Sequence, residues 1–444
     1  MKAMKLKLIA PKCDWGSATN KYPPYVLATL AGLTPSDIDV VIEDQNVEEI
    51  DYDEPVDLVG ITVIVHTAKN AFLIADEFRK RGVTTFMGGV FVEACPDECL
   101  EHADSVILCE VEDIWADILQ DFSDNNYKKC YGSDKRPEIA GLPLPRHDLL
   151  KKKGYLTNNL IMISKGCLNR CQFCTGGVHW KGQVKTRDID DIINEIKSLD
   201  SSQPFIFLDD NLIWNEEYAK EIFRALIPLK IQWICSGACV DCVEDMELIQ
   251  LAKDSGCLAM LLGFETVNEV TLKASGKGFN KVEKYKTTIE NFHKVGIAVQ
   301  GAFIFGLDGD TVNTIKDTVS FIENSDLDML TLNMLYPYPG TPFRDKLIKE
   351  NRLIIDENEW DNFTYNRIMF QPKSMTIKEL ANGFKWATIK LASKEACSKR
   401  LAAAVKYDRA PEYIFDQNMQ FRRHVQKMYG EWSQKELDEL INDC

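Results

Sequence analysis

Short apolar runs alternate with amphipathic segments over most of this chain. In the first 125 residues, five runs typical of buried strands are separated by segments whose apolar residues recur at helical spacing. The strands are predicted at Lys5–Ala10, Val40–Glu43, Leu58–Val63, Thr84–Gly88 and Ser105–Leu108. The helices are predicted at Tyr25–Leu33, Thr67–Arg81, Pro96–His102 and Glu112–Phe122. This alternation predicts a doubly wound, Rossmann-like α/β domain with its ligand site at the carboxyl ends of the strands.

The same alternation continues from about residue 156 to residue 345. Strands are predicted at Leu160–Ile163, Phe205–Asn211, Ile231–Gly237, Leu258–Glu265 and Val299–Leu307, and helices at Arg187–Leu199, Phe343–Asn351 and Thr376–Tyr407. The proline-rich run Leu335–Pro342 is a dense turn signal that ends this second α/β part. We therefore expect an α/β domain over residues 1–125, a linker over 126–155, a second α/β domain over 156–345, and a mostly helical segment over 346–444.

Composition narrows the class of protein. A length of 444 residues, 45% of them hydrophobic and 27% charged, indicates a globular protein of several domains. No apolar stretch is long enough to span a bilayer, and the N-terminus is expected to form the first strand and not a signal peptide, so we expect a cytoplasmic protein. The 14 cysteines are then expected to be reduced or metal-binding. A net charge of −16 disfavours nucleic acid as a partner.

Three cysteines carry the most specific chemistry in the sequence. Cys167, Cys171 and Cys174 form a C-x3-C-x2-C motif between the strand at Leu160–Ile163 and the helix at Arg187–Leu199. Three thiolates in so short a run can hold three irons of a [4Fe–4S] cluster and leave the fourth iron open to a small molecule. The alternative is a zinc site, for which His179 is near enough in sequence to be the fourth ligand.

The order of strand, cysteine loop and helix resembles the opening of the radical S-adenosylmethionine enzymes. The first part of the chain resembles the cobalamin-binding domain that is fused to many of these enzymes. The matching pieces are Tyr22–Tyr25, Asp57–Thr62, Thr67–Ala68, Met87–Val90, Pro96–Leu100, Cys109–Glu112 and, in the linker, Leu142–Leu150. The resemblance covers nearly the whole chain. It implies three cofactors, namely a [4Fe–4S] cluster, S-adenosylmethionine and cobalamin.

For the second domain, the resemblance implies a partial (β/α)6 barrel. We number its strands at Phe205, Ile231, Leu258 and Val299 as second, fourth, fifth and sixth. The resemblance implies that S-adenosylmethionine is bound by the ends of these strands and by the aromatic residue of the cysteine motif. The residues are Phe173, Asp209, Asp210, Ser236, Glu265, Phe305 and Leu307. One of the two aspartates is alternatively a helix N-cap. Gly237–Cys239 stands where related enzymes often have an arginine, which leaves the partner of the methionine carboxylate open.

For the first domain, the resemblance implies a corrin site without the D-x-H-x-x-G histidine. The loop Ile64, Val65, His66 and Thr67 is expected beneath the corrin, with His66 as a neighbour or lower ligand of cobalt. The alternative is that His66 caps the next helix or faces solvent. Gly88, Gly89 and Glu110 are the other candidates for corrin binding, although the two glycines fit an ordinary turn equally well. A domain of this fold that binds no corrin remains a further alternative.

Two other groups of residues have open roles. Cys235, Cys239 and Cys242 repeat the C-x3-C-x2-C spacing, but strand alternation would point Cys235 and Cys239 one way and Cys242 the other. We expect buried or redox-silent thiols there, the alternatives being a second cluster or a hydrogen donor to a radical. Aromatic residues of the C-terminal part are expected either in the core or around the substrate. These are Tyr336, Tyr338, Trp360, Tyr365 and Trp386.

The resemblance implies a C-methyltransferase that acts on an unactivated carbon through a 5′-deoxyadenosyl radical and methylcobalamin. The alternatives are an enzyme with the same cofactors that catalyses a cyclisation or rearrangement, and a sensor that binds a corrin or a cluster. The substrate is open among a peptide or protein side chain, a lipid and a small metabolite. An electron donor such as flavodoxin or ferredoxin is the expected protein partner, and the catalytic residues are unknown.

Overall fold

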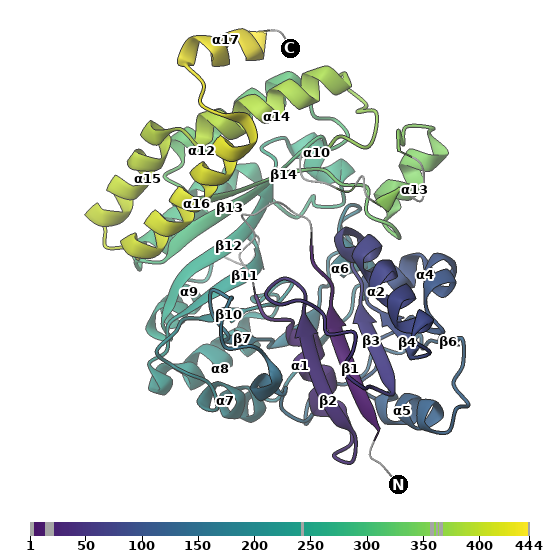
Figure 1. The fold of residues 1–444 in the computed structure, drawn as a ribbon. Helices are drawn as coiled ribbons and strands as arrows, with labels where there is room; N and C mark the ends of the chain where they lie inside the picture. The colour runs from purple at the N-terminus through teal and green to yellow at the C-terminus, as the bar shows by residue number, and fades with distance from the viewer. Residues whose placement is uncertain are drawn as a thin grey trace.

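Two six-stranded sheets, each parallel throughout, organise the chain (Figure 1). The computed structural model describes residues 4–13, 22–240, 244–355, 359–360, 363 and 367–442. We call the part built on the first sheet the N-terminal lobe and the part built on the second sheet the central lobe. Figure 1 shows the N-terminal lobe, in purple and blue, at one end of the central lobe and the C-terminal helices at the other end.

The N-terminal lobe has the strand order β2-β1-β3-β4-β5-β6. Its strands are β1 (Lys5–Ala10), β2 (Asp39–Asp44), β3 (Leu58–Thr62), β4 (Thr84–Gly88), β5 (Ser105–Ile107) and β6 (Cys130–Tyr131). Its helices are α1 (Tyr25–Leu33), α2 (Ala68–Lys80), α3 (Val90–Ala94), α4 (Pro96–His102) and α5 (Trp115–Ser123). The order reverses between β1 and β3, which is where a doubly wound sheet opens a crevice for a ligand. β6, within the segment predicted as a linker, and α3 were not predicted.

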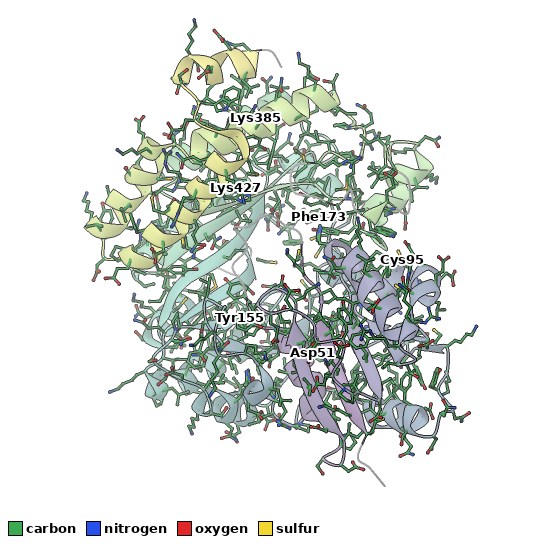
Figure 2. All side chains as sticks on the ribbon, viewed as in Figure 1. Asp51, Cys95, Tyr155, Phe173, Lys385 and Lys427 are labelled. Carbon is green, nitrogen blue, oxygen red and sulfur yellow. The ribbon has the colours of Figure 1, made fainter. Side chains whose placement is uncertain are left out.

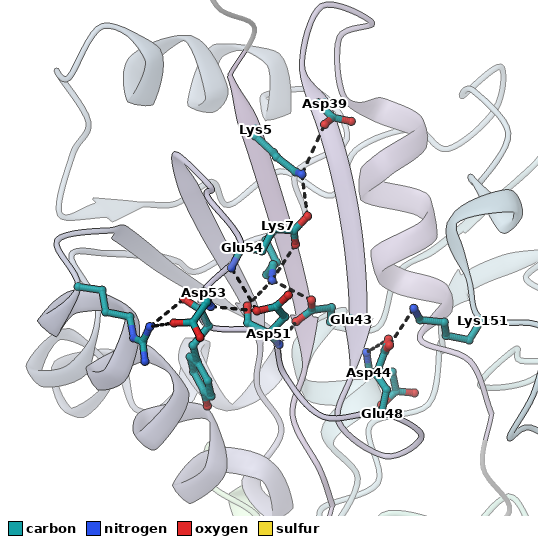
Figure 3. A network of polar contacts seen from close by, with 12 residues as sticks. Lys5, Lys7, Asp39, Glu43, Asp44, Glu48, Asp51, Asp53, Glu54 and Lys151 are labelled. Atoms are coloured by element: carbon teal, nitrogen blue, oxygen red, sulfur yellow. Dashed lines mark hydrogen bonds and ion pairs between the residues drawn. The ribbon is translucent and has the colours of Figure 1, made fainter.

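A completely buried lysine fixes the middle of this sheet (Figure 3). Lys7 on β1 reaches Glu43 Oε1 at 2.8 Å and Glu54 Oε2 at 2.9 Å, and it donates to the Asp51 carbonyl at 2.6 Å. A buried ammonium is stable only when carboxylates and carbonyls replace its water. These contacts therefore hold β1 against β2 and against the loop that precedes β3.

The central lobe has the sequential strand order β7-β10-β11-β12-β13-β14, as in an incomplete barrel. Its strands are β7 (Leu160–Ile161), β10 (Phe205–Phe207), β11 (Trp233–Cys239), β12 (Cys257–Glu265), β13 (Ala298–Phe305) and β14 (Met329–Met334). Its helices are α7 (Ile189–Lys197), α8 (Glu216–Leu226), α9 (Met246–Asp254), α10 (Glu269–Ala274), α11 (Tyr285–Lys294) and α12 (Val312–Asn324). The predicted numbering was wrong for three strands, because β11, β12 and β13 are third, fourth and fifth. The sixth strand is β14, whose alternating sequence Met-Leu-Thr-Leu-Asn-Met the sequence analysis passed over.

Helices dominate the C-terminal part, as predicted. They are α13 (Pro342–Lys349), α14 (Ile377–Leu391), α15 (Lys394–Lys406), α16 (Pro411–Tyr429) and α17 (Gln434–Asn442). A buried ion pair anchors them, since Arg409 donates to Asp328 Oδ1 at 2.8 and 3.1 Å just before β14. Among the described residues, no helix combines the length and the apolar character needed to cross a membrane.

A buried polar cluster joins the two lobes and the segment between them. Glu195 on α7 accepts a hydrogen bond from Tyr25 of the N-terminal lobe at 3.2 Å. The same carboxylate lies 2.8 Å from His147 Nε2 and 2.5 Å from Arg187. Tyr25 and His147 belong to two of the sequence pieces that carry the family resemblance. Their shared partner therefore fixes both pieces against α7 of the central lobe.

Candidate active site

The three motif cysteines lie in a loop that is closely held from several sides. The loop follows β8 (Ser164–Gly166) and leads into α6 (Thr175–His179), and β9 (Val184–Thr186) then pairs antiparallel with β8. Gln172 donates its backbone N–H to Ser275 O at 2.9 Å and accepts one from Phe343 at 3.0 Å. At Gly177 a β-carbon would lie 2.3 Å from Asn169 O, so only glycine allows α6 this close to the loop.

The cysteine side chains suit a cluster better than a single ion. Cys167 and Cys171 are buried, Cys174 is partly buried, and all three are free thiols. A hydrogen bond from Cys239 lowers the pKa of Cys167 to about 7, which favours the thiolate that iron requires. In the described part of the chain, no three His, Cys, Asp or Glu side chains converge on a point where one metal ion would sit. A cubane instead takes each cysteine on a different iron.

Asp209 and Asp210, which follow β10, have different surroundings. Asp209 is fully buried and accepts hydrogen bonds from the backbone N–H groups of Ile163 at 3.2 Å and Ser164 at 2.6 Å, and from the Ser164 hydroxyl at 2.6 Å. Burial raises the pKa of Asp209 to about 6. Asp209 therefore holds the chain that enters the cysteine loop. Asp210 is exposed and accepts a backbone hydrogen bond from Gly166, and neither aspartate is a helix N-cap, since Asn215 caps α8.

Sequence reasoning missed Lys277, the buried cation of this site. Its ammonium pairs with Glu265, which ends β12 after a register shift at Gly263. Burial lowers the pKa of Lys277, but Glu265 and nearby thiols, among them Cys171, give a net rise and keep the lysine charged. A β-carbon at Gly263 would lie 2.6 Å from Glu265 Oε1 and 2.7 Å from Lys277 Nζ. The signal available in the sequence was the Gly-Lys-Gly run that follows α10.

The other residues predicted to bind S-adenosylmethionine differ in how open they are to a ligand. Ser236 is exposed and donates to Phe207 O at 2.8 Å. Phe173 is partly buried against the core. Phe305 is buried against Phe384, and Leu307 is buried beside it, so neither presents a free edge in this structure.

The first of two adjoining cavities, of about 270 Å³, lies at the edge of the N-terminal sheet. Three residues predicted for corrin binding line it, namely Gly88, Gly89 and Glu110, and Ile64 forms part of its wall. A β-carbon added at Gly88 would meet only Ile107, at 3.8 Å, so the strand end leaves open space there. Most of the remaining lining is apolar, from α1 and the strands. The doubly wound fold thus opens its cavity where the strand order predicts.

The second cavity, of about 300 Å³, shares Ile64 and Val90 with the first. Val65, His66 and Tyr338 also line it, as does Thr175, the residue that follows the last motif cysteine. Thr67, the fourth residue of the predicted loop, is buried and instead holds the turn by donating to Ile64 O at 3.1 Å. Of the aromatic residues proposed for the pocket, Tyr336, Trp360 and Trp386 are buried in the core, whereas Tyr365 lies outside the described residues.

His66 neither caps a helix nor faces solvent. Its Nδ1 donates to Phe363 O at 3.0 Å, and its Nε2 accepts from Tyr338 at 3.3 Å. Burial lowers the pKa of His66 to about 4, so the ring is neutral at physiological pH. Both ring nitrogens are engaged in this structure, which makes His66 a neighbour of the cavity and leaves no free nitrogen for cobalt.

Strand alternation failed for Cys235 and Cys239. A register shift between Cys235 and Ala238 interrupts the pairing of β11 with β12. As a result, the Cys235 thiol turns into the core and donates to Gly237 O at 3.1 Å, whereas Cys239 faces the cysteine loop. Such a bulge reverses the side to which the following residues point. Cys242 lies outside the described residues.

Comparisons with known proteins agree with this geometry. A family model described as the Radical SAM superfamily matches residues 161–322. Bacteriochlorophyllide d C-12(1)-methyltransferase from Chlorobaculum tepidum is 30% identical over 337 residues, which are 74% of this chain and 73% of that protein. The methyltransferase TsrM from Kitasatospora setae, solved with cobalamin and a [4Fe–4S] cluster, has the same fold, with a TM-score of 0.71 at 13% identity over 97% of this chain and all of that one. The chain belongs to the cobalamin-binding radical S-adenosylmethionine enzyme family. A second relative, bacteriochlorophyllide d C-8(2)-methyltransferase from the same organism, is 29% identical over 82% of this chain and 86% of its own length.

Enzymes of this family use a [4Fe–4S] cluster, S-adenosylmethionine and cobalamin, and the residues present suit all three groups. The cysteine loop offers free thiols with a buried cation beside them. Asp210 is an exposed carboxylate that follows β10. The first cavity is mostly apolar and is lined by the ends of strands of the N-terminal sheet. Figure 2 shows the side chain of Phe173, from the cysteine motif, between the N-terminal lobe and the C-terminal helices.

In this radical enzyme, charges from both lobes meet at the rim of the first cavity. His179 on α6 binds Glu110 Oε1 through Nε2 at 2.8 Å and Glu93 through Nδ1. Lys165 on β8 binds Glu110 Oε2 at 2.7 Å and also Glu112. His179 is thus committed to carboxylates of the N-terminal lobe and is not the zinc ligand that the sequence left open. Burial raises the pKa of Glu110, but Lys165 and His179 lower it by more, so that the pKa is about 2.

The charge on His179 is expected to make the stability of the radical enzyme depend on pH. Burial lowers the pKa of His179, but Glu110 and Glu93 raise it to about 9. Because the pKa of His179 is higher in the folded state, the charged side chain stabilises the fold fully below its unfolded-state pKa of about 6.5. This stabilisation is lost as the pH rises through 9. Urea unfolding of His179→Gln should therefore show a free energy of unfolding lower than that of the wild type by up to about 3 kcal/mol near pH 6.5, and little difference above pH 9.

His66→Gln is the matched control, because His66 is neutral over this whole range of pH. Its effect on the free energy of unfolding is expected to be the same at pH 6.5 and at pH 9. A His179→Gln difference that stays constant between these pH values would contradict the ionised pairing.

Proposed function

We propose that this protein is a cobalamin-dependent radical S-adenosylmethionine methyltransferase that methylates an unactivated carbon. The single observation that carries the proposal is the arrangement of two adjoining cavities beside the cysteine loop. The first cavity suits a corrin, and the second, which shares Ile64 and Val90 with it, begins at Thr175, next to Cys174. A substrate in the second cavity would thus lie between the cysteine loop, which would hold the cluster, and the first cavity, which would hold the corrin. The two relatives named above, which are 30% and 29% identical and are both methyltransferases, support the same reaction class.

Each half of the chemistry has its own set of residues. When bound, the cluster and S-adenosylmethionine supply a 5′-deoxyadenosyl radical, and cobalamin supplies the methyl group. Cys167, Cys171 and Cys174 hold the cluster, with the fourth iron left to the methionine end of S-adenosylmethionine. Asp210 accepts from the methionine ammonium, as an exposed carboxylate at a strand end can. Lys277 is the cation for the methionine carboxylate, in place of the arginine that related enzymes often have.

Ser236 and Glu265 remain candidates for the ribose, and Phe305 and Leu307 for the edge of the adenine. Gly88, Gly89 and Glu110 form the corrin site, with the loop at Ile64 beneath the ring. The corrin-binding part is formed by residues 1–125, the radical part by residues 156–345 and the substrate-shaping part by residues 346–444. Residues 126–155 link the first two parts. A flavodoxin or ferredoxin supplies the electrons, and we propose a cytoplasmic enzyme.

The lining of the second cavity restricts the substrate. None of its described lining residues is charged, and His66 is neutral. An uncharged carbon centre is therefore favoured there, because an ionic group would lose its hydration without gaining a partner. A chlorophyllide-type tetrapyrrole is the first substrate to test, since both curated relatives act on bacteriochlorophyllide d. A peptide side chain, a lipid and another small metabolite are the further candidates.

The ratio of two co-products tests the proposed reaction. Anaerobic turnover with reductant is expected to yield one 5′-deoxyadenosine and one S-adenosylhomocysteine per methylated product, because one molecule supplies the radical and another the methyl group. Both are quantified in one chromatographic run, with methyl-labelled S-adenosylmethionine and hydroxocobalamin-loaded protein. A cyclase would give 5′-deoxyadenosine without matching S-adenosylhomocysteine, and a sensor would give neither. Protein left colourless after gel filtration would contradict the corrin site.

A further inference from the structure

A third cavity, of about 350 Å³, lies among the C-terminal helices and shares no lining residue with the first two. Its wall is formed by residues of α12, α14, α15 and α17, at the end of the molecule away from the N-terminal lobe (Figure 1). The apolar part of the wall includes Leu327, Trp432 and Leu437. The cavity is therefore separate from the proposed reaction site and has room for a small organic molecule.

Arg400 on α15 brings a buried positive charge to this wall, with its residue only 8% exposed. Its Nε donates to Asn418 Oδ1 at 2.6 Å. Its Nη2 donates to Leu391 O at 2.8 Å and to Cys397 Sγ at 3.3 Å. All three acceptors are uncharged, and Nη1 has no hydrogen-bond partner within the described part of the chain. Because a buried guanidinium is costly without a counter-charge, the missing partner is an anion.

The other charged residues of the wall do not supply this counter-charge. The Glu323 carboxylate pairs with Lys390 at 3.3 Å, while the Glu323 carbonyl accepts from Lys399 Nζ at 2.6 Å. Asp326 and Glu395 also line the cavity, but both are exposed, and water screens their charges from a buried group. Among the described residues, Lys399 and Arg400 are thus the two cations of the wall that lack a carboxylate partner.

We propose that this third cavity binds a small organic carboxylate. The free Nη1 of Arg400 donates to the carboxylate, because a charge-assisted hydrogen bond of this kind compensates the buried guanidinium. The exposed ammonium of Lys399 provides the second positive charge at the opening. The hydrocarbon part of the ligand packs against Leu327, Trp432 and Leu437 and is removed from water.

Isothermal titration calorimetry of the full-length protein with benzoate tests the site. We expect saturable binding of one benzoate per chain with a Kd of about 1 mM or below. Benzyl alcohol lacks the charge and acetate lacks the ring, so each should bind at least about tenfold more weakly. Arg400→Gln is expected to weaken benzoate binding by a similar factor.

Two alanines on α15 provide a matched pair of variants that keep Arg400. Ala403 lines the cavity, so Ala403→Phe fills it and should weaken benzoate binding at least about tenfold. Ala402 is exposed on the same helix and is not part of the described wall, so Ala402→Phe should leave the Kd unchanged. This pair decides the question even if Arg400→Gln folds poorly through the loss of its bond to the end of α14.

Several results would overturn the proposal. Benzoate binding that does not saturate, or that is no tighter than the binding of benzyl alcohol, would remove the anion site. An unchanged Kd in Ala403→Phe would place benzoate elsewhere on the protein. Inorganic phosphate that binds more tightly than benzoate, and that Arg400→Gln releases, would replace the organic carboxylate by a different class of ligand.

Discussion

Replacing Cys167, Cys171 and Cys174 together by alanine is expected to lower the bound iron from about four atoms per chain to none. All three are free thiols in one closely held loop, and the contacts that hold the loop come from the backbone of Gln172 and from neighbouring segments. The variant should therefore fold and still bind a corrin, but it should form no 5′-deoxyadenosine. Iron analysis and Mössbauer spectroscopy of anaerobic protein provide the measurement.

The matched control replaces three other buried cysteines, Cys235, Cys257 and Cys397, by alanine. These thiols donate to carbonyl groups inside the core. Their loss is expected to cost some stability through small cavities but no iron. The assignment of the cluster would be contradicted by full iron content in the variant that lacks the three motif cysteines, or by a loss of iron in the control alone. An iron content near eight atoms per chain in the wild type would indicate a second cluster.

Asp209→Ala is expected to destabilise the protein on the order of 3 kcal/mol, whereas Asp210→Ala should cost no more than about 1 kcal/mol. The first change leaves the backbone donors of Ile163 and Ser164 buried without a partner, and the relief of a buried carboxylate offsets this only in part. Asp210 accepts a backbone hydrogen bond from Gly166, and its exposed position lets water replace that carboxylate when it is removed. Urea unfolding of the two variants at pH 7 measures both effects.

For the binding of S-adenosylmethionine, the larger effect is expected from the replacement of Asp210 and not of Asp209. Loss of a hydrogen bond to a charged group costs about 1.5–3 kcal/mol, so Asp210→Ala should weaken S-adenosylmethionine binding at least tenfold. Equilibrium dialysis against the cluster-loaded protein gives the affinity. Asp210→Asn, which keeps the shape and removes the charge, is the control for geometry. Equal stability losses in Asp209→Ala and Asp210→Ala would contradict the division of roles.

Local patterns predicted the elements well where one periodicity ran without interruption. The bounds of β1, α1 and α4 were predicted to the residue, since β1 and α1 are mostly apolar runs and α4 begins at a proline in its first turn. α5 begins at Trp115, three residues later than predicted, because the acidic residues before it form a turn. β6 has only two residues and exists through its pairing with β5, which no local pattern records.

The site depended more on contacts between distant residues. Asp209 and Asp210 are identical neighbours, and only the end of β10 at Phe207 and the packing of β8 decide which of them is buried. The partners of His179 come from the other lobe, far away in sequence. The orientation of Cys239 depends on a bulge in β11 that the local sequence does not predict. In each case the deciding interaction is tertiary, so spacing alone could not supply it.

The two cavities have consequences for how relatives of this protein could diverge. They share Ile64 and Val90, while Cys13, His66 and Tyr338 line the second cavity alone. Substitutions at these three positions would change the second cavity without touching the wall of the first. Under the proposed function, the space for the acceptor could therefore vary among relatives while the lining of the corrin cavity stays the same.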